Sequence, residues 1–331
     1  MSSDPPTMRA IRYDRTGPAR EVLRLEAVPL PQPGPGEVRV RVHASGVNPS
    51  DVKSRRAPQM RHPEVTPHSD GAGVIEAVGE GVPASRVGER VWLFNSQWKR
   101  PFGTAAEYVV LPARMAVPLP DGVSFETAAC LGIPALTAWE AVHGEDAFDG
   151  ETLLIQGGAG AVGHLAVQFA ARAGKRVIAS VSSADKAALA LAAGAEAAID
   201  YRQEDVAARI AELTGGRGVD RVIEVNLSAN AATYTRVIRP GGRVTVYGSD
   251  NWAAVLPLVD YLIHGLALRF FIVYELNAQQ LDAGIAGVHA ALAAGLDVKI
   301  AARFELADTA AAHEMVEAGR QVGNVVVLPG A

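Results

Sequence analysis

The chain has a single cysteine, Cys130, among its 331 residues. One cysteine cannot form an intrachain disulfide, and it cannot supply a zinc site built from several thiolates. The low count fits a reducing compartment. The sequence also has no apolar stretch of membrane-spanning length, and residues 1–7 lack the apolar core of a signal peptide. We therefore expect a cytoplasmic protein without a membrane segment.

The sequence also lacks an excess of positive charge, low-complexity segments and internal repeats. Lys and Arg number 31 against 36 Asp and Glu, which gives a formal net charge of -5. A nucleic-acid partner would require clustered positive charge, so we expect a small-molecule substrate and no nucleic-acid or membrane partner. Hydrophobic residues make up 49% and charged residues 20%, as in globular proteins. A chain of this length usually forms two domains.

The first third of the chain has a β-rich pattern. In residues 38–45, valine and alanine alternate with arginine, histidine and serine, which is the period-two pattern of a half-buried strand. We expect further short strands at 8–13, 74–78, 90–94 and 105–110. Many strands without helices favour a barrel or a sandwich.

From about residue 124, short apolar runs alternate with alanine-rich helical stretches. We expect strands at 153–156, 176–181, 197–199, 221–225, 243–247 and 268–273. We expect helices at 161–173, 185–193, 204–213, 229–238 and 257–264. This alternation predicts βαβ units in a doubly wound parallel sheet. Two helices (278–293, 309–318) and a strand (324–328) fall outside that sheet, so we expect the C-terminus to return to the first domain.

A glycine-rich turn lies between the strand expected at 151–156 and the helix expected at 164–173. Gly158, Gly160 and Gly163 have the G-x-G-x-x-G spacing that permits a tight turn and close backbone approach to a pyrophosphate. The backbone N–H groups at the helix start, including those of Ala161 and Val162, favour an anion. We predict that these five residues bind a dinucleotide; the alternative is an ordinary strand-to-helix turn.

The residues after the next strand bear on the choice of dinucleotide. In sites that prefer NAD, an acid near the end of that strand bonds the ribose 2′-OH, whereas here Ser182 and Ser183 end the strand. Lys186 follows in the first helical turn, where a cation suits a 2′-phosphate. We therefore predict NADPH. Two alternatives remain open: Lys186 is a solvated helix residue, or Asp185 faces the ribose.

Several motifs resemble the zinc-free quinone oxidoreductase (zeta-crystallin-like) branch of the medium-chain dehydrogenase/reductase superfamily. They are HASGVNPSD at 43–51, SDGAGVI at 69–75, GIPALTA at 132–138, the glycine turn, IDYR at 199–202, GGRGVD at 215–220 and PGGR at 240–243. The resemblance implies an α/β fold with two domains. These are a GroES-like β domain, residues 1–129 completed by 275–331, and a Rossmann domain with a doubly wound parallel sheet, residues 130–274. The resemblance also implies an active site in the cleft between them.

Zinc alcohol dehydrogenases of the same superfamily carry Cys, His and Cys ligands at positions that correspond here to Asn48, Ser69 and Ile133. None of these is a thiol or an imidazole, and the adjacent His68 would lack two further ligands. We therefore expect no metal. Without a Lewis acid, the acceptor must be electrophilic by itself, as a quinone or an α,β-unsaturated carbonyl is. The enzyme would mainly position it against the nicotinamide.

The resemblance makes Asn48, Asp51 and Lys53 the catalytic candidates. Asn48 is similar to the family's active-site asparagine, which bonds an acceptor oxygen or a water, although it could instead only cap the turn before Pro49. Asp51 would organise that loop, more as a structural than as a catalytic residue. Lys53 replaces a tyrosine of many members and resembles the lysine of alkenal and enone reductases. It could donate to a developing enolate or hydroquinone oxygen, or be a solvated surface residue.

The resemblance also adds cofactor contacts. Lys186 and Tyr201 resemble the pair that grips the adenosine 2′-phosphate in bacterial relatives. Thr137 is similar to a threonine near the nicotinamide ribose. Three further candidates lie at the ends of strands that pass the cofactor: Gly248, Ser249 and Asn324.

Two further features concern the substrate and assembly. Trp92, Phe94 and Trp98 form an aromatic cluster, which is either a lid over an apolar substrate or core packing. Residues 268–273 would form an apolar edge strand, which favours pairing with its own copy. We therefore expect a homodimer.

Three functions remain in competition. The leading one is an NADPH-dependent oxidoreductase that reduces quinones by zinc-independent hydride or electron transfer. The second is an NADPH-dependent 2-alkenal or enone (enoyl) reductase, including an enoyl reductase domain that works in trans. The third is an NADPH-binding protein with little turnover.

Overall fold

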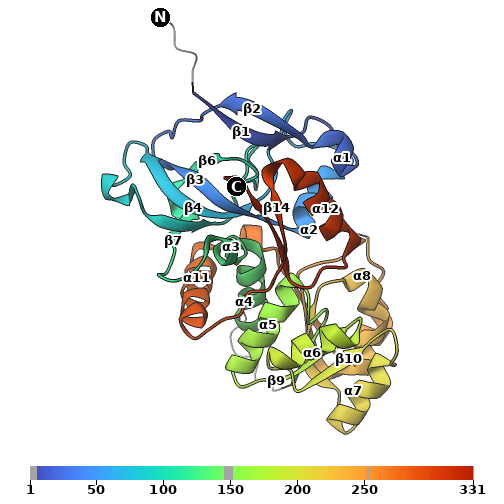
Figure 1. Cartoon of the computed structure of the whole chain (residues 1–331). Coiled ribbons are helices and arrows are strands. Elements are labelled where there is room, and N and C mark those ends of the chain that lie inside the picture. Colours follow the sequence, from blue (N-terminus) through green and yellow to red (C-terminus); the bar gives the residue numbers. More distant parts are fainter. Residues whose placement is uncertain (1–5, 145–151, 252, 331) are drawn as a thin grey trace, which may run out of the picture. The chain divides into compact units, whose positions relative to one another are not determined.

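The computed structural model describes residues 6–144, 152–251 and 253–330. The chain divides into two compact units (Figure 1). Unit 1 contains residues 1–133 and 298–331, and unit 2 contains residues 134–297. Glu151, which we expected to begin a strand, lies outside the described residues. No helix in the described part of the chain is long and apolar enough to cross a membrane.

Unit 1 is built around the long strand β3 (Glu37–Val47), which pairs antiparallel with β4, β6 and β15. The order of its main sheet is β14-β15-β3-β4-β5-β7. The other strands are β4 (Asp70–Val78), β5 (Arg90–Leu93), β6 (Tyr108–Pro112), β7 (Ala116–Pro118), β14 (Ile300–Glu305) and β15 (Asn324–Leu328). A second sheet pairs β1 (Thr7–Arg12) with β2 (Arg24–Pro29). The expected return of the C-terminus to the first domain is confirmed by β14 and β15.

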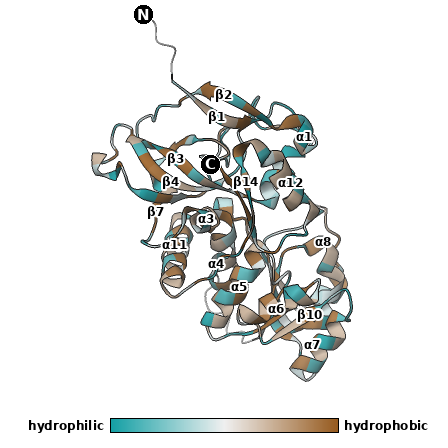
Figure 2. Cartoon of the chain, viewed as in Figure 1, coloured by the Kyte–Doolittle hydropathy of each residue, from teal (hydrophilic) through white to brown (hydrophobic). Residues whose placement is uncertain are grey.

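The main core of unit 1 follows from the alternation of β3. Val38, Val40 and Val42 are buried and pack against residues of β4, β5 and β6, including Ile75 and Leu111. Figure 2 shows this apolar character along β3 and β4. The α-helices in the described part of unit 1 are α1 (Ala19–Val22), α2 (Pro49–Arg55), α3 (Phe125–Ala128) and α12 (Thr309–Ala318).

Unit 2 contains a six-stranded sheet in which all neighbouring strands are parallel, in the order β10-β9-β8-β11-β12-β13. Counted from the first strand of the unit, this is 3-2-1-4-5-6, the order of a dinucleotide-binding Rossmann fold. The strands are β8 (Thr152–Ile155), β9 (Arg176–Val181), β10 (Ala197–Asp200), β11 (Val219–Glu224), β12 (Ile238–Val246) and β13 (Ala267–Phe270). The predicted fold class is therefore confirmed.

The helices of unit 2 alternate with these strands, as expected. They are α4 (Leu136–His143), α5 (Ala161–Arg172), α6 (Ala184–Ala192), α7 (Val206–Thr214), α8 (Leu227–Asn230), α9 (Tyr234–Val237), α10 (Leu258–His264) and α11 (Ala278–Ala293). The expected helix at 229–238 is divided into α8, a short 3₁₀ turn and α9. Asn230 and Tyr234 both donate to the buried Glu224 of β11, and the sequence pattern does not show this tertiary contact.

The limit of unit 2 differs from the domain limit drawn from the sequence. We placed residues 275–331 with the first domain, but residues 275–297, including α11, belong to unit 2. A side-chain carbon at Gly287 would lie 2.3 Å from the ring of Trp139, and one at Gly284 would lie 3.0 Å from Leu136. The two glycines therefore let α11 pack closely on α4. Small residues in a helix do not show which element the helix packs on, so the sequence pattern could not assign α11 to unit 2.

Candidate functional site

The glycine turn joins β8 to α5 and is held against the neighbouring strand β9. The Gly158 N–H donates to the Ser180 carbonyl at 2.9 Å, and the Gly157 N–H donates to the Ser180 hydroxyl at 3.2 Å. That hydroxyl in turn donates to the Gln156 side chain, and both side chains are buried. Sequence reasoning missed Gln156 and Ser180. Their only signal was a polar residue within or beside an apolar strand.

The three glycines of the motif meet different surroundings. A methyl group at Gly163 would lie 2.1 Å from the Gly157 carbonyl oxygen, and one at Gly158 would lie 2.6 Å from the Ala179 side chain. Packing therefore requires glycine at both positions. At Gly160 the nearest atom would be the Gly157 carbonyl oxygen at 3.3 Å, so a methyl group would fit there after a small adjustment. The backbone at Gly160 is open to a ligand.

The start of α5 fits a pyrophosphate. Gly160 is its N-cap residue, and within the described residues no side chain caps this terminus. The N–H groups of Ala161, Val162 and Gly163 have no acceptor within the helix, because the first turn of any α-helix leaves them unpaired. Their partial positive charge favours an anion.

Four residues expected around the adenosine 2′-phosphate lie at one edge of the sheet. The Lys186 ammonium donates to the Ser182 hydroxyl at 3.1 Å, and the Ser183 hydroxyl caps α6. The N–H of Tyr201 donates to the Val181 carbonyl at 3.1 Å, because β9 and β10 are adjacent. The Tyr201 side chain is half exposed. An ammonium, two hydroxyls and a phenol are suitable donors for a phosphate.

The remaining cofactor candidates are distributed over both units. Gly248 and Ser249 follow β12, where the Gly248 carbonyl accepts from Leu227 at 3.2 Å and the Ser249 hydroxyl accepts from Ser228 at 3.2 Å. Thr137 is buried on α4 of unit 2. Asn324 begins β15 in unit 1, and its side-chain amide donates to the Lys299 carbonyl at 3.0 Å. Cofactor contact by these four residues stays a prediction.

Asn48 lies at the junction of β3 and α2 as the N-cap residue of that helix. Its backbone N–H donates to the Asp51 carboxyl at 2.8 Å. Its side-chain nitrogen donates to the Asp70 carboxyl at 2.8 Å, and all three side chains are buried. We call these residues the Asn48–Asp51–Asp70 cluster. The structure therefore shows the capping role of Asn48, and contact with an acceptor stays a prediction.

Burial determines the protonation of this cluster. It raises the pKa of Asp51 to about 7, against hydrogen bonds from Asn48 and from the backbone of Ser69 and His68. Burial also raises the pKa of Asp70 well above its ordinary value, and the nearby Asp51 adds to this effect. Two carboxyl groups close together in a buried site do not readily ionise together. Asp70 was part of a quoted motif, but sequence reasoning gave it no role.

The other residues considered for catalysis or metal binding lie in unit 1. Lys53 has an exposed side chain on α2. Ser69 and Ile133 are buried, and the described residues contain no group of three or more His, Cys, Asp or Glu side chains that could hold a metal ion. Of the aromatic cluster, Trp92 and Phe94 are buried core residues, with ring centroids 6.0 Å apart.

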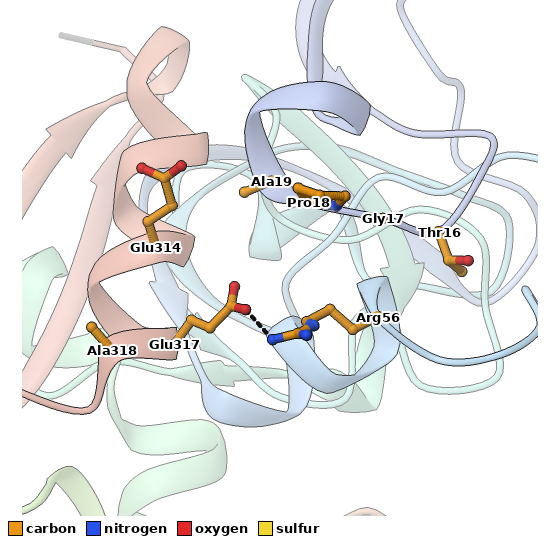
Figure 3. Close-up of a pocket in the computed structure, with 8 residues that line it drawn as sticks. All are labelled: Thr16, Gly17, Pro18, Ala19, Arg56, Glu314, Glu317 and Ala318. Atoms are coloured by element: carbon orange, nitrogen blue, oxygen red, sulfur yellow. Dashed lines mark hydrogen bonds and ion pairs between the residues drawn. The ribbon is translucent and has the colours of Figure 1, made fainter.

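A surface hollow of about 590 Å³ lies elsewhere in unit 1, beside α1, α2 and α12 (Figure 3). Arg56 and Glu317 form an ion pair in it, and Glu314 pairs with Arg20 at 2.9 Å. None of the residues predicted for catalysis or cofactor binding is among those that line it. The charged residues that line it are all engaged in ion pairs, Glu314 with Arg20 outside the lining.

Comparison with known proteins identifies the family. Residues 34–121 match the model of the alcohol dehydrogenase GroES-like domain, and residues 161–286 match that of zinc-binding dehydrogenases. A quinone oxidoreductase of Rattus norvegicus is 31% identical over 99% of this chain and 100% of its own length. A 2-haloacrylate reductase of a Burkholderia species is 31% identical over 81% of this chain and 82% of its own.

A similar solved structure is that of a mycobacterial protein complexed with NADPH. It has a TM-score of 0.88 and 31% sequence identity, and the match covers 97% of this chain and 100% of that one. The similarity to this structure and to the rat protein extends over nearly all of both units. The chain therefore belongs to the medium-chain dehydrogenase/reductase superfamily and, within it, to the quinone oxidoreductase family.

Proposed function

We propose that this protein is an NADPH-dependent oxidoreductase that reduces quinones without zinc. The observation that carries the proposal is the Asn48–Asp51–Asp70 cluster. Asn48 of this cluster stands at one of the three positions that correspond to zinc ligands, and its amide, held by Asp51 and Asp70, is neither a thiolate nor an imidazole. The full-length similarity to a quinone oxidoreductase supports the same conclusion.

The cofactor is NADPH, which supplies a hydride when bound. The open N-terminus of α5, from Gly160 to Gly163, holds the pyrophosphate through backbone N–H groups. Lys186, Ser182 and Tyr201 hold the 2′-phosphate at the adjacent strand ends. The mycobacterial neighbour solved with NADPH supports this assignment.

The residues of unit 1 position the acceptor and assist its protonation. Asn48 orients an acceptor oxygen directly or through a water, and Asp51 and Asp70 hold Asn48 in place. Lys53 is the exposed donor on α2. We assign it a hydrogen bond to the oxygen that gains negative charge during reduction. Reduction of a quinone adds one hydride and one proton, so a donor near that oxygen favours the reaction.

The second candidate function is an NADPH-dependent 2-alkenal or enone reductase. The similarity to a 2-haloacrylate reductase favours it, because a 2-haloacrylate is an alkene conjugated to a carboxylate. Lys53 in place of an aromatic residue also suits an enolate oxygen better than a stacked quinone ring. A protein that binds NADPH with little turnover is the third candidate.

A homodimer in the cytoplasm completes the proposal. β13 is the last strand of its sheet and offers an edge. Apolar side chains on α10 and β13 are largely exposed, among them Leu262, Ile263 and Phe270. Exposed apolar residues beside a sheet edge favour pairing with a second copy.

Initial rates of NADPH oxidation with a panel of acceptors test the proposal. The panel contains 1,4-benzoquinone, 9,10-phenanthrenequinone, 2-alkenals of several lengths and, with NADP⁺, secondary alcohols. We expect NADPH oxidation with quinones at a rate that metal chelators do not change. We expect Asn48→Ala to lower that rate. Faster turnover of 2-alkenals would favour the second candidate, and no turnover despite NADPH binding would favour the third. Alcohol oxidation that requires added zinc would overturn all three.

A further inference from the structure

His68 has a backbone conformation that is uncommon for residues other than glycine. Its φ angle is +77°, in the left-handed region that glycine occupies readily and that other residues occupy at a cost. Its side chain is fully buried. A strained, buried residue persists only where its surroundings compensate for the strain. The surroundings of His68 include its backbone, whose carbonyl accepts from the Thr104 N–H at 3.0 Å, and its imidazole ring.

The ring of His68 is part of a buried chain of hydrogen bonds within unit 1. Its Nε2 lies 2.9 Å from Nε2 of His313 on α12, and its Nδ1 lies 2.8 Å from the Ser45 hydroxyl of β3. The Ser45 hydroxyl lies 2.8 Å from the Thr104 hydroxyl. All four side chains are fully buried. We call this arrangement the histidine chain.

The direction of donation in the histidine chain follows from its end. The Thr104 hydroxyl contacts the carbonyl oxygen of Asp70, and a carbonyl can only accept. Thr104 therefore donates to Asp70, Ser45 donates to Thr104, and Ser45 accepts from the Nδ1–H of His68. The Nε2 of His68 is then left as an acceptor, and His313 must donate to it through its Nε2–H.

The protonation of both rings agrees with this direction. Burial lowers the pKa of His68 well below its ordinary value, helped by His313, and burial lowers the pKa of His313 to about 3. Both rings are therefore neutral, and each carries one N–H. The Nδ1 of His313 has no hydrogen-bond partner in the described part of the chain, which is compatible with its being a bare acceptor.

A chain that ends at a backbone carbonyl cannot pass a proton onward, so its role is orientation. Its last acceptor is the backbone of Asp70, whose carboxyl accepts from the Asn48 amide at 2.8 Å. The backbone of His68 itself hydrogen-bonds Asp51. His68 is thus connected to the Asn48–Asp51–Asp70 cluster in two ways: its ring through Ser45 and Thr104 to Asp70, and its backbone directly to Asp51.

We infer that His68, oriented by His313, is a positioning residue for the Asn48 amide. The inference rests on the proposed role of Asn48 in the reductase. It assigns α12 a part in the reaction, because α12 supplies His313, which is more than two hundred residues from Asn48 in the sequence. Loss of the His313 donor leaves a buried acceptor on His68 unpaired, and the loop from His68 to Asp70 shifts to satisfy it.

The first experiment determines the tautomers of the wild-type protein by long-range ¹H–¹⁵N correlation of its labelled histidines. We expect His68 to carry its proton on Nδ1 and His313 on Nε2, with neither ring titrating between about pH 5 and 8. His313→Gln loses the signals of His313 and His68→Gln loses those of His68, so the two variants assign the two rings among the eight histidines. A proton on Nε2 of His68, or titration of either ring in that range, would overturn the inference.

The second experiment compares His313→Phe, which keeps a ring but removes the donor, with His313→Gln, which keeps an N–H donor. We expect His313→Phe to shift the Asn48 side-chain amide resonances and lower kcat about tenfold, with little change in the Kd of NADPH. His313→Gln should restore much of both. His43→Phe is the control, because the His43 ring stacks on Phe125 at 4.5 Å and its Nε2 has no partner among the described residues.

Two results would overturn the positioning role: unmoved Asn48 amide resonances in folded His313→Phe, or an equal loss of kcat in the His43→Phe control. A wild-type protein without reductase turnover would instead overturn the proposed function, while the amide resonances and the tautomers would still decide the positioning role. If His313→Phe does not fold, the tautomers of the wild-type protein remain decisive.

Discussion

Two alanine substitutions in the glycine turn separate packing from cofactor binding. In Gly163→Ala the new methyl carbon would lie 2.1 Å from the Gly157 carbonyl oxygen and 2.8 Å from its carbon. Both neighbours are backbone atoms, so the turn must open to accept the methyl group. In Gly160→Ala the nearest atom is 3.3 Å away and the φ angle is -76°, so alanine fits with a small adjustment.

The structure predicts different magnitudes for the two variants. Overpacking typically costs about 1–3 kcal/mol, and Gly163→Ala should reach the upper end, because its contact is more than 1 Å too short. Gly160→Ala should change the free energy of unfolding by only about 0.5 kcal/mol. Its methyl group would instead prevent close approach of the pyrophosphate. Loss of one charge-assisted hydrogen bond, about 1.5–3 kcal/mol, weakens NADPH binding about 10- to 100-fold.

Thermal unfolding and NADPH titration by fluorescence or calorimetry measure the two effects separately. We expect Gly163→Ala to lower Tm and weaken NADPH, and Gly160→Ala to weaken NADPH at a Tm close to that of the wild type. Gly174→Ala is a control for the loss of a glycine, because its surroundings are open but its φ angle is +71°, so it should affect Tm alone. Wild-type affinity for NADPH in Gly160→Ala would refute the assignment of the α5 terminus.

Three further predictions concern the cofactor, the buried carboxyl groups and assembly. Lys186→Ala should weaken NADPH about 10- to 100-fold and NADH little, because the lost contact is to the 2′-phosphate; an equal loss for both in titrations would contradict the assignment. The pKa of Asp51 is raised to about 7. The protonated Asp51 carboxyl therefore makes its full contribution to the free energy of unfolding below the pKa of about 4 that it has in the unfolded chain. This contribution is lost as the pH rises toward 7. Urea unfolding at about pH 5 and 8 should show that the free energy of unfolding declines less in Asp51→Asn than in the wild type. Equal declines in the two proteins would count against the raised pKa of Asp51. Sedimentation should show a wild-type dimer that Ile263→Asp or Phe270→Asp dissociates, whereas a wild-type monomer at micromolar concentration would contradict the dimer.

Much of the fold could be predicted because its signals are local. The alternation of valines in β3 and the strand–turn–helix around Gly158 depend on periods of two and 3.6 residues and on glycine spacing. These patterns placed all six strands of the parallel sheet. They failed where a segment gains its structure from a distant partner: α11 joins unit 2 because Gly287 packs on Trp139, and the helix expected at 229–238 is interrupted beside Glu224.

The candidate site divides in the same way. Gly160 follows the end of β8, and Ser182 and Lys186 follow the end of β9. These residues are recognisable from the sequence because, in a βαβ unit, the distance of a residue from the end of its strand determines where it lies in the fold. Asn48 and Asp51 are likewise only three residues apart, as the N-cap and N3 residues of α2.

The sequence by itself thus determined the fold class, the glycine turn between β8 and α5 and the residues next to it. Only the tertiary structure decided which buried polar groups meet. Ser180 supports the glycine turn from a neighbouring strand, Asp70 holds Asn48, and His313 reaches His68 from the far end of the chain. A hydrogen bond between side chains on different elements leaves no period or spacing in the sequence, because the fold alone determines its partners.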